Sequence, residues 1–121
     1  MINVQQAIYN FWCGFGLPVY DEDTVPDTAQ LPYITYEAVN DFLGAEYVVT
    51  TSVWYRSTSW AEVTAKEQEI AERIGRGGIM LPCDGGGIWI KRGTPWAQRI
   101  IEPEDRDIRR IALNCELDFV I

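Results

Sequence analysis

The sequence predicts one α+β domain over residues 1–121. Two stretches carry apolar side chains at helical spacing, and the stretches between and after them are rich in the β-branched and aromatic residues of strands. The last stretch alternates between apolar and polar residues, which is typical of an antiparallel strand with one buried face. Apolar residues make up 47% of the chain, which is enough for one hydrophobic core.

The first predicted helix covers residues 2–12, where Val4, Ile8 and Phe11 recur on one helical face. Two glycines and a proline follow it closely and end it. Residues 20–31 are polar and contain a proline, so we expect an exposed loop there.

Two strands are predicted next, at residues 32–38 and 46–56. The second strand alternates imperfectly, which indicates that parts of both faces are covered. A second helix is predicted at residues 59–75, because apolar residues keep helical spacing there and glycines follow. Ser59 and Glu62 match a capping box, in which each side chain accepts a hydrogen bond from the other residue's backbone N–H.

The remaining residues predict two hairpins. Strands at 79–83 and 88–92 flank the glycine-rich residues 84–87, and strands at 96–101 and 107–121 flank an acidic turn. The last strand places its arginine-and-apolar positions on one face and its polar positions on the other, so we expect one wet face.

The run DGGGIWIKRG, residues 84–93, also raises the possibility of a phosphate-binding loop. Such a loop needs a lysine followed by serine or threonine, and then a helix whose N-terminus faces the phosphates. Here Lys91 follows a strand-like Ile-Trp-Ile run, and Gly-Thr-Pro comes soon after it in place of a helix. Glycines after Asp84 supply the positive φ of a tight turn, so we predict a hairpin.

Composition narrows the function classes. The chain carries a net charge of −8, which repels phosphate backbones and argues against sequence-specific nucleic-acid binding. It contains no histidine, which removes histidine-based triads and histidine-ligated zinc. The three widely spaced cysteines have apolar neighbours, so we expect reduced core thiols. No apolar run reaches membrane-spanning length and no signal peptide begins the chain, so we expect a soluble cytoplasmic protein.

Two acidic clusters were weighed as sites. Asp21, Glu22 and Asp23 lack the spacing and the glycine of an EF-hand loop, so a solvated loop is favoured over a calcium site. The carboxylates of residues 102–105 would need a pocket to act as an acid/base pair, and they flank a proline in a turn. The sequence thus predicts no catalytic, cofactor-binding or metal-binding residue and no cofactor.

Arginine and tryptophan provide the candidate contacts. Of the five tryptophans, Trp12 and Trp54 suit a core, whereas those of the late hairpin lie among charges and suit an interface or a core edge equally. Basic residues of the C-terminal third are expected to form ion pairs across strands or subunits. The predicted contact regions are the hairpin Ile88–Trp96 and the acidic loop Asp21–Gln30. The candidate residues are Asp21, Glu22, Asp23, Trp89, Lys91, Arg92, Trp96 and Arg99.

The order of elements, with an L-P-Y-I-T-Y strand and the turn EPEDRDIRR before a long last strand, resembles a known family. It is similar to the small tail-completion and tail-terminator proteins of long-tailed bacteriophages and prophages, over nearly the whole chain. A Pro-Tyr-Ile strand, a strand such as Val48–Arg56 and an Ala- and Glu-rich helix such as Ala61–Ile74 carry the likeness. The acidic loop and the triple glycine are not part of it.

The resemblance implies an antiparallel sheet with two main helices packed on one face. It implies a virion role at the head–tail junction, as a possible ring that contacts tail-tube and head–tail connector proteins, without catalysis. Such a protein would be found in the virion and, during assembly, in the host cytoplasm. The alternatives are a small cytoplasmic adaptor or regulatory binding module, and a carboxylate-based enzyme with a pocket that joins distant acids.

Overall fold

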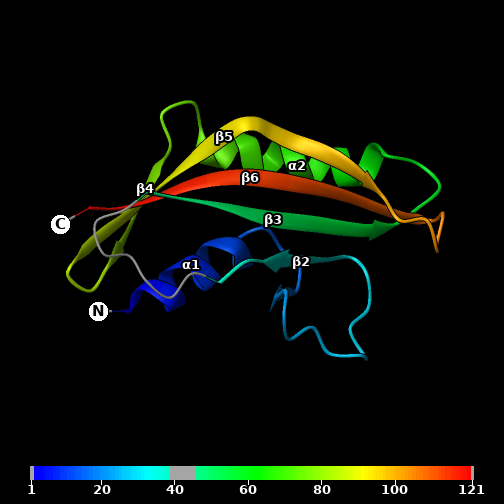
Figure 1. The fold of residues 1–121 in the computed structure, drawn as a ribbon, viewed down its shortest axis with the longest axis horizontal. Coiled ribbons are helices and arrows are strands. Elements are labelled where there is room, and N and C mark those ends of the chain that lie inside the picture. Colours follow the sequence, from blue (N-terminus) through cyan, green and yellow to red (C-terminus); the bar gives the residue numbers. More distant parts are fainter. Residues whose placement is uncertain (1, 39–45, 121) are drawn as a thin grey trace.

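In the computed structural model, residues 2–38 and 46–120 are described, and they form one curled sheet with two helices (Figure 1). Both predicted helices and the long predicted strands are present. The elements in chain order are α1 (Val4–Cys13), β1 (Val19–Asp21), β2 (Tyr33–Tyr36), β3 (Glu46–Arg56), α2 (Ala61–Ile74), β4 (Ile79–Cys83), β5 (Gly86–Ile101) and β6 (Ile108–Val120).

The sheet has six strands in the order β1-β2-β3-β6-β5-β4. Every neighbouring pair is antiparallel except β1 and β2, which run parallel with Val19 opposite Ile34. The sheet is therefore mixed, and the prediction of a purely antiparallel sheet is wrong at this edge. The sequence predicts a loop at residues 20–21, because a strand of three residues is too short to show periodicity.

Strands β3 and β6 form the centre of the sheet and pair over their whole lengths, from Glu46 opposite Asp118 to Arg56 opposite Ile108. The alternation predicted for the last strand is confirmed, because every second residue from Ile111 to Leu117 faces the core. The two central strands are thus buried on one face, as in an antiparallel sheet that packs on a core.

Strand β5 is one bent strand where the sequence predicted two. The pairing with β6 shifts between Arg92 and Ala97, which places a bulge at the Gly-Thr-Pro-Trp segment. A Cβ at Gly93 would lie 2.8 Å from the carbonyl oxygen of Asn114, so glycine lets the two backbones approach closely there. The bulge bends β5 across the sheet without ending it.

The glycine-rich run forms the turn of a hairpin, as predicted. Cys83 pairs with Gly86, and Gly85 between them has a φ of +84°. β5, rather than a helix, follows the glycines, so the N-terminal helix end that a phosphate-binding loop requires is not there.

The two helices begin in different ways. Asn3 caps α1, because its side-chain oxygen accepts a hydrogen bond from the Gln6 backbone N–H at 2.8 Å. The capping box predicted for α2 is wrong. Ser59 Oγ accepts from the Ala61 backbone N–H at 3.0 Å in the preceding turn, and Trp60 occupies the cap position without a side-chain bond.

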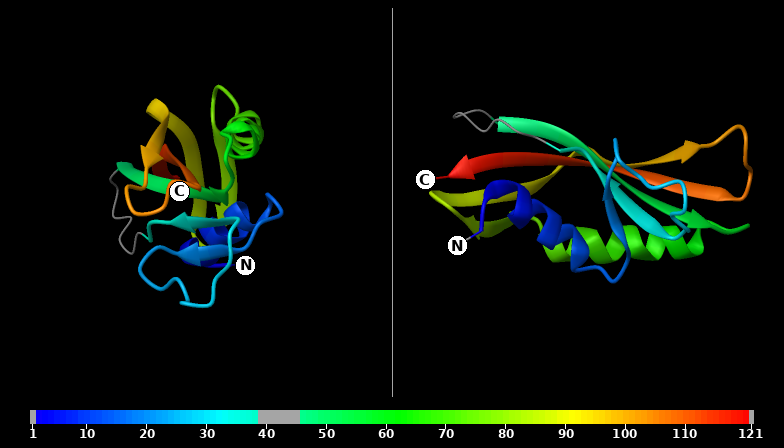
Figure 2. Two further views of the ribbon diagram at one scale, coloured as in Figure 1. Left: turned by 90° about the vertical axis from the view of Figure 1, so that its right-hand side faces the viewer. Right: turned by 90° about the horizontal axis from the view of Figure 1, so that it is seen from below.

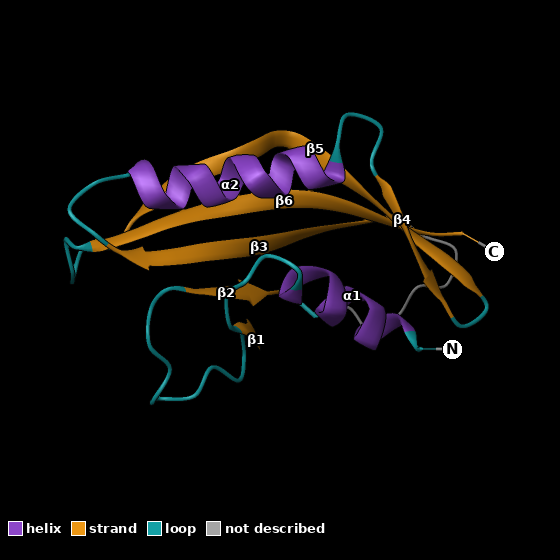
Figure 3. Ribbon diagram, turned by 180° about the vertical axis from the view of Figure 1, so that it is seen from behind, coloured by secondary structure: helices purple, strands orange, loops and turns teal. Residues whose placement is uncertain are grey.

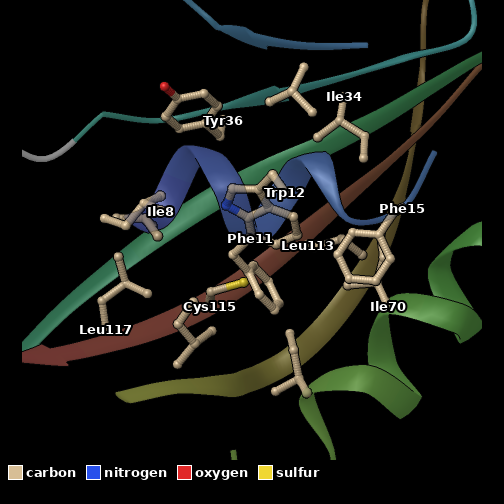
Figure 4. Packing of buried hydrophobic residues seen from close by; sticks show 14 of the residues in the cluster. Ile8, Phe11, Trp12, Phe15, Ile34, Tyr36, Ile70, Leu113, Cys115 and Leu117 are labelled. Carbon is tan, nitrogen blue, oxygen red and sulfur yellow. The ribbon is translucent and has the colours of Figure 1, made fainter. Parts of the chain in front are cut away.

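Both helices lie on the same face of the sheet, as the resemblance implied (Figures 2 and 3). α2 packs over β3, β6 and β5, whereas α1 contacts the edge strands β1 and β4, so the sheet curls around α1. The core between them holds Phe11 and Trp12 of α1, Ile70 of α2, and Leu113 and Cys115 of β6 (Figure 4). Among residues 2–38 and 46–120, no helix covers the opposite face of the sheet, and we call it the helix-free face.

The cysteines fit the core prediction in part. Cys83 and Cys115 are fully buried free thiols, and burial raises the pKa of Cys115 to about 12. Cys13 is exposed, because it lies at the last turn of α1 on the side away from the core, so the core prediction is wrong for this residue.

Candidate protein-contact surfaces

A row of aromatic rings crosses the helix-free face and ends on an arginine. Tyr33, Trp54 and Arg110 are cross-strand neighbours on β2, β3 and β6. The ring centroids of Tyr20 and Tyr33 lie 5.6 Å apart, and those of Tyr33 and Trp54 lie 6.1 Å apart. The Arg110 guanidinium carbon lies 4.5 Å from the Trp54 ring centroid. All four side chains are half-buried, so the row is ordered and partly accessible.

Hydrogen bonds fix this row in place. Trp54 Nε1 donates to Thr35 Oγ1 at 2.9 Å, and Arg110 Nε donates to Ser52 Oγ at 3.0 Å. Arg110 also pairs with Glu102 at 3.5 Å. Trp54 had been predicted in the core. That prediction is wrong, because sequence alternation separates two faces without saying which face the helices cover.

The late-hairpin residues separate onto two faces. Trp89 and Lys91 lie on the helix-free face, opposite Asp118 and Glu116. The Lys91 Nζ lies 4.5 Å from the Trp89 ring centroid and 3.9 Å from a Glu116 carboxylate oxygen. The expectation of ion pairs across strands is confirmed here. Trp89 Nε1 donates to the carbonyl of Gly77 at 2.9 Å, which ties the hairpin to the loop after α2.

The other three late-hairpin candidates lie on the side of the sheet that α2 covers. Trp96 Nε1 donates to Glu67 of α2 at 3.3 Å, and Trp96 packs against the core cluster. Arg99 lies over the ring of Trp60, and Arg92 lines a groove beside the C-terminal end of α2. One continuous contact patch therefore does not contain all of the predicted residues of the hairpin.

The acidic loop begins at the β1 edge. Asp21 lies in β1, and its carboxylate accepts a hydrogen bond from the Asp23 backbone N–H at 2.9 Å. Partial burial, and then the nearby carboxylates of Glu37, Asp23 and Asp21, raise the pKa of Glu22, while Arg110 lowers it. In the sheet order β1 is four strands from β5, so the structure does not bring the acidic loop and the late hairpin together along the sheet.

A groove of about 500 Å³ lies between the start of α2 and the β5–β6 turn. No sequence pattern predicted this groove. Its lining residues, which define the Trp60 groove, are Trp60, Ile101, Glu102, Pro103, Arg106, Ile108 and Arg109. The guanidinium carbons of Arg99 and Arg109 lie 4.7 Å and 5.2 Å from the Trp60 ring centroid. The sequence shows a tryptophan just before the second predicted helix and arginines on later strands. Only the fold shows that these residues lie together.

Two of the four acids in the β5–β6 turn form ion pairs. Glu102 pairs with Arg110, and Asp105 pairs with Arg56 at 2.9 Å. The pKa of Asp105 is lowered, first by the backbone N–H of Asp107 and then by Arg56. Within residues 2–38 and 46–120, no three acidic or cysteine side chains are grouped closely enough to hold a metal ion.

One solved structure shares this fold. It is a chain of the "Virion of native gene transfer agent (GTA) particle", with a TM-score of 0.65 and 23% sequence identity. The match covers 97% of the present chain and 94% of the other. No family model and no curated protein sequence matches the chain.

At this identity the likeness establishes the fold, and it does so along almost the whole length of both chains. The same arrangement of sheet and helices is thus found in another protein. No described helix has the length and apolarity to span a membrane.

Proposed function

We propose that this chain is a structural subunit of a phage or prophage virion and acts through protein contacts without catalysis. The observation that carries the proposal is the end-to-end fold match to a chain of a GTA virion, with 97% and 94% of the two chains covered. A match that leaves almost nothing over on either side indicates a similar single unit rather than a shared fragment.

The finer part of the proposal is a tail-completion or tail-terminator role at the head–tail junction. The sequence resemblance supports it, because the quoted Pro-Tyr-Ile segment lies at β2, the Val48–Arg56 segment lies within β3, and the Ala61–Ile74 segment is α2. The proposed partners are further copies of this chain, in a ring, together with tail-tube and connector proteins. The ordered aromatic row with Arg110 has the residue types that are enriched at protein interfaces.

The net charge of the chain is compatible with a position at the head–tail junction. A ring at the junction lets DNA pass, and a net charge of −8 per subunit would discourage the passing phosphates from binding. The chain would then hold its protein neighbours while leaving the DNA unbound.

Light scattering on the purified protein, followed by electron microscopy of the oligomeric fraction, tests the proposal. We expect a closed ring, or ring formation on addition of the tail-tube or connector protein encoded beside it. A strict monomer that binds neither of these proteins, but instead captures a cytoplasmic regulator, would support the adaptor alternative.

A further inference from the structure

The Trp60 groove presents apolar surface to solvent. Ile101 on its wall is 79% exposed, the highest value for a large apolar side chain among the described residues. Pro103 and Ile108 line the groove beside it, and the half-buried ring of Trp60 completes the apolar surface. Tryptophan with arginine at the edge of an apolar pocket is the composition of an interface hot spot.

The same groove carries two arginines that form no ion pair within the described part of the chain, although two exposed acids of the turn, Glu104 and Asp107, flank Arg106. Arg99 stacks on Trp60 and Arg106 is exposed in the lining, and neither forms an ion pair with another described residue. Arg109 donates to the carbonyls of Arg106 and Thr58, so it fixes the turn. The single carboxylate in the lining, that of Glu102, is held by Arg110 on the other side of β6.

The acidic loop has the complementary character. Four carboxylates lie within residues 21–27, and none of them forms an ion pair with another described residue. Val25 and Pro26 stand between Asp23 and Asp27, and Pro26 is exposed. The loop thus offers an apolar centre with acidic flanks, which matches an apolar groove with arginines on its rim.

These two surfaces lie at the same end of the molecule but on opposite sides. In Figures 1 and 3 the loop that follows β1 lies on one side, and α2 with β5 lies on the other. Within one chain β2 and β3 lie between β1 and the β6 residues of the groove, and none of residues 22–27 lines it, so the loop does not fill its own groove. A second copy placed alongside would bring its loop to the groove.

The geometry points to a subunit contact in which residues 22–27 of one copy occupy the Trp60 groove of the next copy. The inference rests on the proposed function and deepens it by naming the contact that joins neighbouring subunits. Because the two patches differ, the contact is heterologous, and repetition closes into a ring if the rotation between copies permits. The matched charges fix the order of the copies and accelerate their encounter.

Two charge-reversal variants test the contact. Asp23→Lys/Asp27→Lys changes the net charge of residues 22–27 from −3 to +1 and leaves the groove arginines in place. Arg99→Glu/Arg106→Glu makes the groove acidic and leaves the loop acidic. Like charges then meet in each variant, so we expect the apparent dissociation constant to rise at least about tenfold, measured by sedimentation or light scattering at 50 mM salt. An equimolar mixture pairs opposite charges at both contacts, so we expect association to return.

Control substitutions at other sites change the net charge in the same direction as each test variant, by half as much. Asp84→Lys changes the charge by the same sign at the β4–β5 turn, and Arg76→Glu does so at the C-terminal end of α2, away from the Trp60 groove. Both controls should associate as the unmodified protein does. Circular dichroism melting of every variant shows that the fold is retained.

The mixture decides the outcome. Recovery of association only in the mixture supports the contact. A wild-type protein that never self-associates, charge-reversal variants that each associate like wild type, or a mixture as weak as its components would overturn it. Incorporation of the chain into virions is measured separately. Association through another surface would therefore disprove this contact without disproving the proposed function.

Discussion

The two faces of β6 place side chains of different character within one strand. On the core face, Leu113 and Cys115 have no exposed surface and pack against both helices. On the helix-free face, Arg110 and Asn114 are half-buried and are held by hydrogen bonds to Ser52, Thr50 and the Pro95 carbonyl. One face is stabilised by burial of apolar area and the other by polar links between strands.

The difference shows how the domain keeps one face open without losing order. The hydrophobic contribution to the free energy of folding comes mainly from the core face, where apolar area is removed from water. The helix-free face contributes less to stability, but its side chains are fixed in position and ready for contact. Substitutions on the two faces should therefore separate folding from assembly.

The largest expected effect is on the core face. Leu113→Ala should lower the free energy of unfolding by about 2–5 kcal/mol, because it leaves a cavity at a fully buried site. Glu116→Ala, three residues along on the other face, should cost less than about 1 kcal/mol, because its ion pair with Lys91 is partly exposed. Urea unfolding of the two variants measures the contrast, and equal losses would contradict it.

The bulge in β5 gives the next largest effect. Gly93→Ala places a Cβ 2.8 Å from the backbone oxygen of Asn114, so β5 and β6 must separate. We expect a loss of about 1–3 kcal/mol in thermal or urea unfolding. Gly77→Ala is the matched control, since nothing lies within 4 Å of its added Cβ and no positive φ is required there. A Gly93→Ala protein as stable as this control would show that the bulge is not close-packed.

A smaller loss is expected from the helix-free face. Arg110→Ala removes the hydrogen bond to the buried Ser52 hydroxyl and the stacking on Trp54, and should cost about 1–2 kcal/mol. Arg110→Lys keeps the charge and should lose about half as much. Indole fluorescence in the folded state should change in the alanine variant, because the guanidinium leaves the Trp54 ring. An unchanged spectrum and unchanged stability would contradict the described stacking.

The smallest effect should depend on pH. The pKa of Asp105 is lowered in the folded protein by the Asp107 N–H and Arg56, so its contribution is present above the unfolded pKa and is lost as pH falls through the folded pKa. Asp105→Asn should therefore be less stable than wild type at pH 7, and the difference should shrink as the pH falls through the lowered folded pKa of Asp105. A difference that grows on acidification would reverse the assigned sign.

Local pattern was enough to predict much of this fold. The alternation along the last strand, the apolar spacing of α2 and the turn residues at Asp84 each depend on neighbours within a few residues. Such patterns lie within short stretches of sequence, so they can be recognised without knowledge of the fold. The parallel edge strand β1 was not predictable in this way, because its three residues pair with a strand more than ten positions away.

The contact surfaces depend on long-range packing, and the sequence analysis captured them only in part. Trp54 reads as a core residue until the fold shows that the helices cover the other face. Trp60 joins Arg99 and Arg109 across a span of about forty to fifty positions, so neither arginine marks a site alone. The acidic loop was visible as a charged stretch, but its complement became visible only when the Trp60 groove was assembled.

The most direct test of the central claim is to locate this chain in particles made by the cells that encode it. An epitope-tagged chain should co-purify with intact particles and should be labelled by gold-conjugated antibody at the head–tail junction. Particles that contain none of the chain, with all of it recovered in the cytosolic fraction, would contradict a structural role in the virion.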